Sequence, residues 1–225
     1  MKSRASDHVF INCPFDKSYA NMFHACVFTV LDAGFIPRCS LEIDDATQFR
    51  LSAILSLIDG CQYGVHDLSR IRLDSTSKLP RFNMPFELGL FYSAKHFGSL
   101  SQKRKQCLIL ESEKYRYQKF ISDIAGVDIT PHENSSEKLI LALRNWLVTA
   151  SRRTTIPPGE KIKARFNAFQ SSIRKACRKN GIDYSAMPFV ERVQNMTDWL
   201  RITDYSCQTI LPIGMMVYKE RVKIE

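Results

Sequence analysis

The stretch from Arg81 to Gly89 carries the carboxylate of Glu87 at a place where the sequence favours the start of a helix. Asn83 can cap such a helix, and Pro85 suits a first turn, where a missing backbone N–H costs nothing. We therefore expect Glu87 in the first turn, where the positive end of the helix dipole would keep its carboxylate ionised. The alternative is a structural Glu87 that bonds back to the cap residue, as in a capping box.

Three further side chains with ionisable or reactive groups lie where strands are expected to end. Asp67 ends a buried-strand pattern, but an Asp-Leu-Ser sequence can also simply cap a turn. His66 could act as a base, although a packed, hydrogen-bonded histidine is the commoner role at such a position. Cys13 could be a nucleophile, but no activating partner is evident in the sequence, which favours a packed thiol.

Several familiar chemistries have no motif in this chain. There is no Gly-x-Gly-x-x-Gly, no Walker loop and no Gly-x-Ser-x-Gly elbow, which argues against dinucleotide dehydrogenases, P-loop NTPases and serine hydrolases. The five histidines lack metal-ligand spacing, so no metal site is expected. The seven cysteines include no Cys-x-x-Cys pair, and buried free thiols are expected at four of them: Cys26, Cys39, Cys61 and Cys107.

Apolar periodicity divides residues 8–150 into alternating strands and helices. We expect strands at residues 8–12, 35–41, 61–67, 105–111 and 127–130. We expect helices at residues 19–33, 46–58, 86–96 and 115–123, and a last helix that a capping box at 134–137 opens and that ends near 150. Strict alternation with helical crossovers indicates a doubly wound, flavodoxin-like α/β fold whose five parallel strands have the order 2-1-3-4-5.

Ligands of open parallel sheets bind beyond the carboxyl ends of the strands, where the strand order reverses. For the expected order this point lies between the first and third strands, so Asn12, Asp67 and Glu87 should converge there. Arg38, Asp44 and Arg50 could reach the same rim from the side of the second strand, and each arginine could be a phosphate clamp or an ordinary surface residue.

A Thr-Thr-Ile-Pro-Pro-Gly linker at residues 154–159 separates an α/β domain, residues 1–151, from a C-terminal extension, residues 152–225. Apolar stripes predict two helices in the extension, ending near Gly181 and Leu200, which should pack on the α/β domain or on a second subunit. The net charge of +9 is concentrated here, because the extension holds 14 Lys and Arg against 7 Asp and Glu. The extension could bind nucleic acid, a nucleotide or an acidic partner, or present a solvated basic face.

The composition is that of an ordinary globular protein, with a hydrophobic share of 44%. No apolar run is long enough to span a bilayer, and the first residues lack the apolar core of a signal peptide. Together with the free thiols, these features predict a cytoplasmic protein without a membrane partner.

The strand that ends in Asp67 and the sequence Asn83-Met84-Pro85-Phe86-Glu87-Leu88-Gly89 resemble the strand-end Asp and the Phe-Glu-Leu-Gly helix start of nucleoside 2-deoxyribosyltransferases. They are equally similar to bacterial TIR-like (Toll/interleukin-1 receptor-like) nucleotide-binding domains, whose nucleotide-contacting loop would correspond to residues 10–15 here. The resemblance covers residues 8–150. The chain departs from TIR domains in lacking a clear Trp before the Glu, and from the transferases in its opening loop and its extension.

The resemblance implies cleavage of an N-glycosidic bond, with Glu87 as the catalytic residue and Asp67 as a contact to the base. An ionised carboxylate beneath the ribose C1′ stabilises an oxocarbenium-like transition state or attacks it. Nicotinamide leaves NAD without a general acid, whereas a nucleoside base leaves better with a proton that Asp67 could supply. The other substrate contacts that we expect are Asn12, Cys13, Pro14, Phe15, Arg38, Ser69, Asn83 and Phe86.

Three functions are consistent with these residues, in descending order of preference. The first is an NAD glycohydrolase or ADP-ribosyl cyclase of bacterial anti-phage defence, a hydrolase that uses NAD as substrate, needs no cofactor, and works as a homo-oligomer or with a partner protein of the defence system. The second is a nucleoside or nucleotide deoxyribosyltransferase or N-glycosidase. The third is a non-catalytic TIR-like module that senses a nucleotide or binds a partner.

Overall fold

The computed structural model describes residues 5–71 and 81–203, and its centre is one parallel sheet of five strands in the order β2-β1-β3-β4-β5. The strands are β1 (His8–Asn12), β2 (Ile36–Arg38), β3 (Tyr63–Asp67), β4 (Gln106–Glu111) and β5 (Thr130–Pro131). This confirms the predicted flavodoxin-like, doubly wound order. The central strand β3 is buried along its whole length, as expected for a parallel sheet with helices on both faces.

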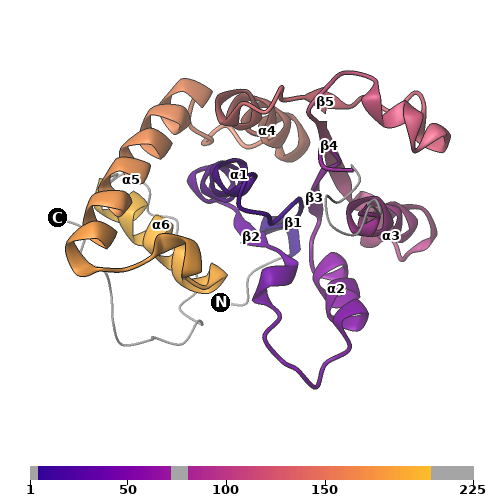
Figure 1. Ribbon diagram of the computed structural model, residues 1–225. Helices are drawn as coiled ribbons and strands as arrows, with labels where there is room; N and C mark the ends of the chain where they lie inside the picture. Colours follow the sequence, from indigo (N-terminus) through magenta and orange to yellow (C-terminus); the bar gives the residue numbers. More distant parts are fainter. Residues whose placement is uncertain (1–4, 72–80, 204–225) are drawn as a thin grey trace.

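The described part of the chain contains six α-helices, four of which cover the two faces of the sheet (Figure 1). They are α1 (Ala20–Asp32), α2 (Arg50–Asp59), α3 (Asn83–Phe97), α4 (Ser136–Ser151), α5 (Gly159–Asn180) and α6 (Phe189–Thr203). Helices α1 and α4 pack on one face, α2 and α3 on the other, and α5 and α6 lie on the outer side of α1 (Figure 1).

Helix α1 is buried on almost every side because the sheet covers one face and the C-terminal extension covers the other. The ring of Phe28 in α1 lies 5.6 Å from Phe166 and 5.5 Å from Phe169 of α5, and 6.0 Å from Trp199 of α6, between centroids. The extension therefore shares one hydrophobic core with the α/β domain instead of forming its own. A helix that is apolar all round, such as α1, is typical of such a central position.

Polar contacts show that α5 runs antiparallel to α1. A buried ion pair of 2.8 Å joins Arg165, near the start of α5, to Asp32, the last residue of α1. Near the other end of α5, the charge of Arg174 acts on His24, which lies in the first half of α1. Burial, Arg192 and Arg174 together lower the pKa of His24 to about 4, so this imidazole is neutral at physiological pH. The end of α5 therefore lies at the same edge of the sheet as the start of α1.

The segment after β4 differs from the prediction of an α-helix at residues 115–123. It contains two short 3-10 turns, Arg116–Lys119 and Ser122–Ile124, instead. Tyr115 has the left-handed φ of 65°, and a single short segment gains too few hydrogen bonds to offset the cost of starting an α-helix. The apolar residues of this segment still pack inward, on a small cluster that includes Leu68 and Met84.

The burial of the cysteines and the hydropathy of the helices can be compared with the predictions from the sequence. Cys26, Cys39 and Cys61 are buried free thiols and Cys107 is partly buried, as predicted. Within residues 5–71 and 81–203, no helix combines the length and the apolar character that crossing a membrane requires. The apolar segment 209–218 lies outside the described residues.

Candidate active site

Asn12, at the carboxyl end of β1, ties together the three elements that were expected to converge. Its side-chain amide donates a hydrogen bond of 2.8 Å to the carbonyl oxygen of Met84 in the first turn of α3. The same amide lies 3.1 Å from Nδ1 of His66 in β3, which accepts because burial and Lys105 lower the pKa of His66 to about 3. Asn12 thus fixes where α3 begins relative to the sheet, and His66 is a packed, neutral histidine.

Helix α3 begins differently from the prediction. Its cap position is Phe82, no side chain caps it, and Asn83 is already its first helical residue. Pro85 lies in the first turn as expected, but Glu87 is the fifth residue and falls in the second turn. The predicted Asn83 cap and the capping-box alternative for Glu87 are therefore wrong. The backbone of Phe82 already has right-handed dihedral angles (φ −93°, ψ −2°), so the helix begins one residue earlier than expected.

The charge state of Glu87 also differs from the prediction of a fully ionised carboxylate. Burial raises its pKa to about 7, and the nearby Arg50 guanidinium only partly opposes this shift. The field of a helix terminus fades within the first turn, so it does little for a carboxylate in the second. In the described part of the chain no group hydrogen-bonds to this carboxylate. Glu87 is therefore poised between its two protonation states near neutral pH.

The electrostatic contacts of Glu87 place it above the ends of the first two strands. Burial raises the pKa of the Cys13 thiol, which follows β1, and the charge of Glu87 adds to that shift. Burial likewise raises the pKa of Cys39, which follows β2, and Glu87 again contributes. Both thiols remain protonated, so the nucleophilic role considered for Cys13 has no support in its environment.

Asp67 lies at the same edge in an entirely different environment. It is 1% exposed, its Oδ2 accepts a hydrogen bond from the hydroxyl of Tyr19, and its Oδ1 accepts one of 2.8 Å from the backbone N–H of Ser69. Nε2 of His132, which follows β5, lies 2.9 Å from Oδ2. Burial alone would raise the pKa of Asp67, but the hydrogen bonds from His132, Ser69 and Tyr19 outweigh it and hold the pKa below its usual value. Asp67 is an ionised, fully bonded anchor.

The predicted site residues divide into an accessible group and a buried group. Glu87 is partly exposed, and the other accessible residues at the carboxyl edge are Phe15, Asn83 and Phe86. The buried group lies beneath this surface and consists of Asn12, Cys13, Pro14, Asp67 and Ser69. Side chains of the first group can touch a ligand at this edge, whereas those of the second support the surface from below.

Arg38 is not brought to the site. Its guanidinium pairs with Glu42 at 2.7 Å and lies 3.3 Å from Nδ1 of His8, which is at the opposite end of β1. The cation that does reach the site from the β2 side is Arg50, the first residue of α2, which acts on Glu87 and lies 3.3 Å from the Ser40 hydroxyl. Arg50 is exposed and so can also meet an anionic ligand.

Exposed aromatic side chains precede Glu87 in the sequence and occur in the loop after β1. Phe82 and Phe86 are 61% and 55% exposed at the start of α3, and Phe15 is 38% exposed in the loop after β1. Phe10, at the start of the loop segment that the resemblance indicated, is fully buried in the core and cannot stack on a ligand. Exposed rings beside an ionisable carboxylate provide the stacking surface that a nucleobase requires.

Tyr19 and His132 are the site residues that sequence reasoning missed. His132 directly follows the last strand, so the rule that drew attention to Asn12 and Asp67 would have found it too. Tyr19 precedes α1 and gave no comparable signal, because an aromatic residue before a helix is usually a core residue. Their hydrogen bonds explain why Asp67 is buried without being neutralised.

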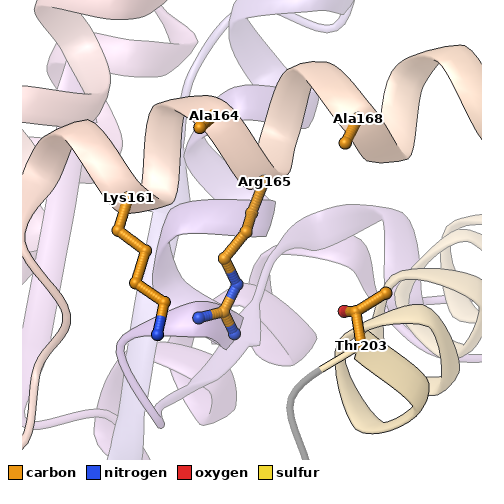
Figure 2. Close-up of a pocket in the computed structure, with 5 residues that line it drawn as sticks. All are labelled: Lys161, Ala164, Arg165, Ala168 and Thr203. Carbon is orange, nitrogen blue, oxygen red and sulfur yellow. The ribbon is translucent and has the colours of Figure 1, made fainter.

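A hollow of about 300 Å³ lies far from Glu87, between the first half of α5 and the end of α6. Figure 2 shows the side chains of Lys161 and Arg165 pointing from α5 toward the space beside Thr203. Because Arg165 is held by Asp32 at the end of α1, this hollow lies toward the opposite edge of the sheet from the candidate site. It contributes nothing to the chemistry around Glu87.

No three His, Cys, Asp or Glu side chains of residues 5–71 and 81–203 are grouped as a metal site would need. Comparisons with protein-family models, with curated proteins and with solved structures found no match to this chain. The site must therefore be interpreted from its own geometry.

Proposed function

We propose that the protein cleaves N-glycosidic bonds and that NAD is its substrate, with Glu87 as the catalytic carboxylate. The observation that carries this proposal is the environment of Glu87: a partly buried carboxyl beyond the ends of β1 and β2, with a pKa near 7 and no hydrogen bond from any described residue. A carboxyl group that accepts no hydrogen bond from the described residues is available to a substrate. Perturbed pKa values are also typical of catalytic groups.

The reaction requires few protein groups. The C1′–N bond breaks, its electron pair passes to the pyridinium nitrogen of nicotinamide, and nicotinamide leaves as a neutral molecule. The ionised Glu87 stabilises the positive charge that develops on the ribose. A water oxygen then bonds to C1′, and its proton can pass to Glu87, whose pKa near 7 suits a general base. Transfer to a hydroxyl of the substrate instead of water would give a cyclic product.

The state of Asp67 favours NAD over nucleosides. A neutral base leaves a nucleoside most readily when a general acid protonates it, and Asp67 was the expected acid. Its lowered pKa and its three hydrogen bonds leave it ionised and occupied, without a proton to give. Nicotinamide in NAD already carries the positive charge that drives its departure, so it needs no such acid.

The positive charge of NAD also suits the pKa of Glu87. Desolvation holds that pKa high in the free protein, and a pyridinium ring placed nearby would stabilise the ionised form. Substrate binding would thus convert Glu87 to the state that catalysis uses. The aromatic rings of Phe15 and Phe86 would stack on the bases of the dinucleotide, and Arg50 would meet its diphosphate.

The test is a product assay on a mixture of NAD, nucleosides and deoxynucleotides, at several protein concentrations because enzymes of this kind often act as assemblies. We expect free nicotinamide, and no free nicotinamide from the Glu87→Gln variant. The exposed Glu191 on α6 provides a matched control, and Glu191→Gln should retain full activity. Release of bases from nucleosides with NAD left intact would replace this proposal by a nucleosidase or deoxyribosyltransferase.

The exposed aromatic side chains support one further function. Phe15, Phe82 and Phe86 would serve a protein that binds a nucleotide without cleaving it equally well. In that case no substrate would be consumed, and NAD would raise the melting temperature of wild type and Glu87→Gln alike.

A further inference from the structure

The cations of the C-terminal extension differ in whether the fold neutralises them. Among the described residues, ion pairs hold Arg153 with Asp7, Lys163 with Glu160, Arg165 with Asp32 and Arg201 with Asp198. Near the end of α5, in contrast, Arg174, Lys175 and Arg178 are exposed, and no acidic side chain of the described residues lies within ion-pair distance of them. Three cations without an acidic partner among the described residues therefore lie together in the last two turns of one helix.

Two of these cations form a row on α5, and the third lies beside it. Arg174 and Arg178 are four residues apart, which places them on one face with about 6 Å of helix rise between them, and Lys175 directly follows Arg174. Cations in a last turn also complement the negative end of the helix dipole, which accounts for Arg178. The same effect does not account for Arg174 and Lys175, which lie one turn earlier.

The direction of α5 brings these cations to the edge of the sheet that holds the candidate site. The Arg165–Asp32 pair places the start of α5 beside the end of α1, so the last turns of α5 lie beside the start of α1. The loop between β1 and α1 adds Lys17, whose exposed ammonium acts on Asp183 just after α5. The basic α5 surface, defined as Lys17, Arg174, Lys175 and Arg178, therefore adjoins the loop that carries Phe15.

We propose that the basic α5 surface binds the phosphodiester backbone of a nucleic acid, at the same edge of the sheet as Glu87. Guanidinium groups bind phosphate oxygens in a bidentate manner, and ammonium groups add compact positive charge. A row of cations suits a backbone in which phosphates recur regularly. This binding function is separate from bond cleavage and does not depend on it.

The composition of the surface favours nucleic acid over an anionic membrane. Membrane-surface helices pair their cations with a broad apolar face that inserts among the lipids. The apolar side chains of α5 are already buried against α1 and α6, including Ile162, Phe166, Phe169 and Ile173. Only the charged side of this helix remains available to a partner.

The experiment measures fluorescence anisotropy of labelled 20-nucleotide single-stranded DNA, single-stranded RNA and duplex DNA with the full chain over a range of salt concentrations. We expect binding that weakens steeply with salt. The triple variant Arg174→Gln, Lys175→Gln, Arg178→Gln should lose at least about tenfold in affinity, and its log–log salt slope should be shallower by about 2 on single strands. The three probes identify which form of nucleic acid is preferred.

A control with the same change in net charge isolates the position of the cations. Arg152→Gln, Lys161→Gln, Arg201→Gln removes three exposed cations elsewhere in the extension, and it should bind within about twofold of wild type. Circular dichroism and melting temperature show that both variants are folded. Equal losses in both variants, or no salt-dependent binding by wild type, would overturn the proposal. Nicotinamide release is measured separately, so a negative result here leaves the glycohydrolase test intact.

Discussion

Two carboxylates at the carboxyl edge of one sheet have opposite environments. Asp67 is buried beneath the surface, receives hydrogen bonds from Tyr19 and Ser69 and a contact from His132, and has a lowered pKa. Glu87 is only partly buried, has no such bonds within the described residues, and has a pKa raised to about 7. Burial acts on both, so the number of donors decides which carboxyl is an anchor and which is available for catalysis.

Of the two carboxylates, Glu87 should have the larger effect on activity when its charge is removed. We expect Glu87→Gln to lower kcat/KM for NAD by at least about a thousandfold, because the developing ribosyl cation loses its counter-charge. The melting temperature at pH 7 should not fall. Residual turnover within tenfold of wild type would show that another group carries the reaction.

Asp67→Asn should have its main effect on stability. Asparagine keeps the shape but loses the charge. When its carbonyl oxygen faces Tyr19 and His132, its amide nitrogen faces the backbone N–H of Ser69, and two donors then oppose each other. We expect a loss of about 3 kcal/mol in the free energy of unfolding, or roughly 10 °C in melting temperature. Chemical denaturation at pH 7 measures it. If the variant were as stable as wild type but inactive, Asp67 would be a substrate contact and not an anchor.

The pH dependence of activity reports the state of Glu87. If the ionised carboxylate is required, kcat/KM should rise with pH through an inflection near 7. Arg50→Gln removes the cation that favours ionisation, so the inflection should move to higher pH and activity at pH 6.5 should fall by about threefold. Lys161→Gln, far from Glu87 on α5, is the control. An unchanged inflection would mean that Arg50 does not act on Glu87.

The smallest effect concerns stability. The pKa of Glu87 is about 7 in the folded chain and near 4.5 when unfolded, so wild type loses stability as pH rises from 4.5 through 7. Glu87→Gln does not titrate and should be the more stable protein at pH 8, by on the order of 1 kcal/mol after allowance for partial exposure. At pH 4 the two should melt alike. Denaturant titrations at both pH values provide the check.

Much of the architecture could be predicted because it depends on local patterns. Alternating apolar strands and helices indicated the parallel sheet, and the strand order followed from crossover rules. The polar segment at residues 134–137 correctly indicated the start of α4. The predicted capping box is wrong in detail, because the cap is Ser135, whose hydroxyl accepts a hydrogen bond from the N–H of Lys138. The prediction of a helix at residues 115–123 was wrong because Tyr115 has a left-handed φ and two short 3-10 turns form instead. Apolar spacing predicts neither feature.

The candidate site was predictable in position but not in electrostatics. Parallel topology alone places Asn12, Asp67 and Glu87 at one edge, whatever their partners are. A shift of the helix start by one residue moved Glu87 from the first turn to the second, and this removed the expected influence of the helix dipole. The bond from Ser69 to Asp67 is the local turn that the Asp-Leu-Ser sequence allowed, but Tyr19 and His132 lie 48 residues before and 65 residues after Asp67, and no local pattern links them to it.

The sequence by itself therefore determined the strand order, the edge at which the polar residues gather and the excess of positive charge in the extension. Only the tertiary structure decided that Arg38 turns to His8, that Asp67 is bonded on both oxygens, and that Glu87 is desolvated without a donor. It also decided that α5 brings its basic end to the site edge. The physical reason is that topology follows from short-range periodicity, whereas pKa values and hydrogen bonds depend on which distant groups the fold places within a few ångströms.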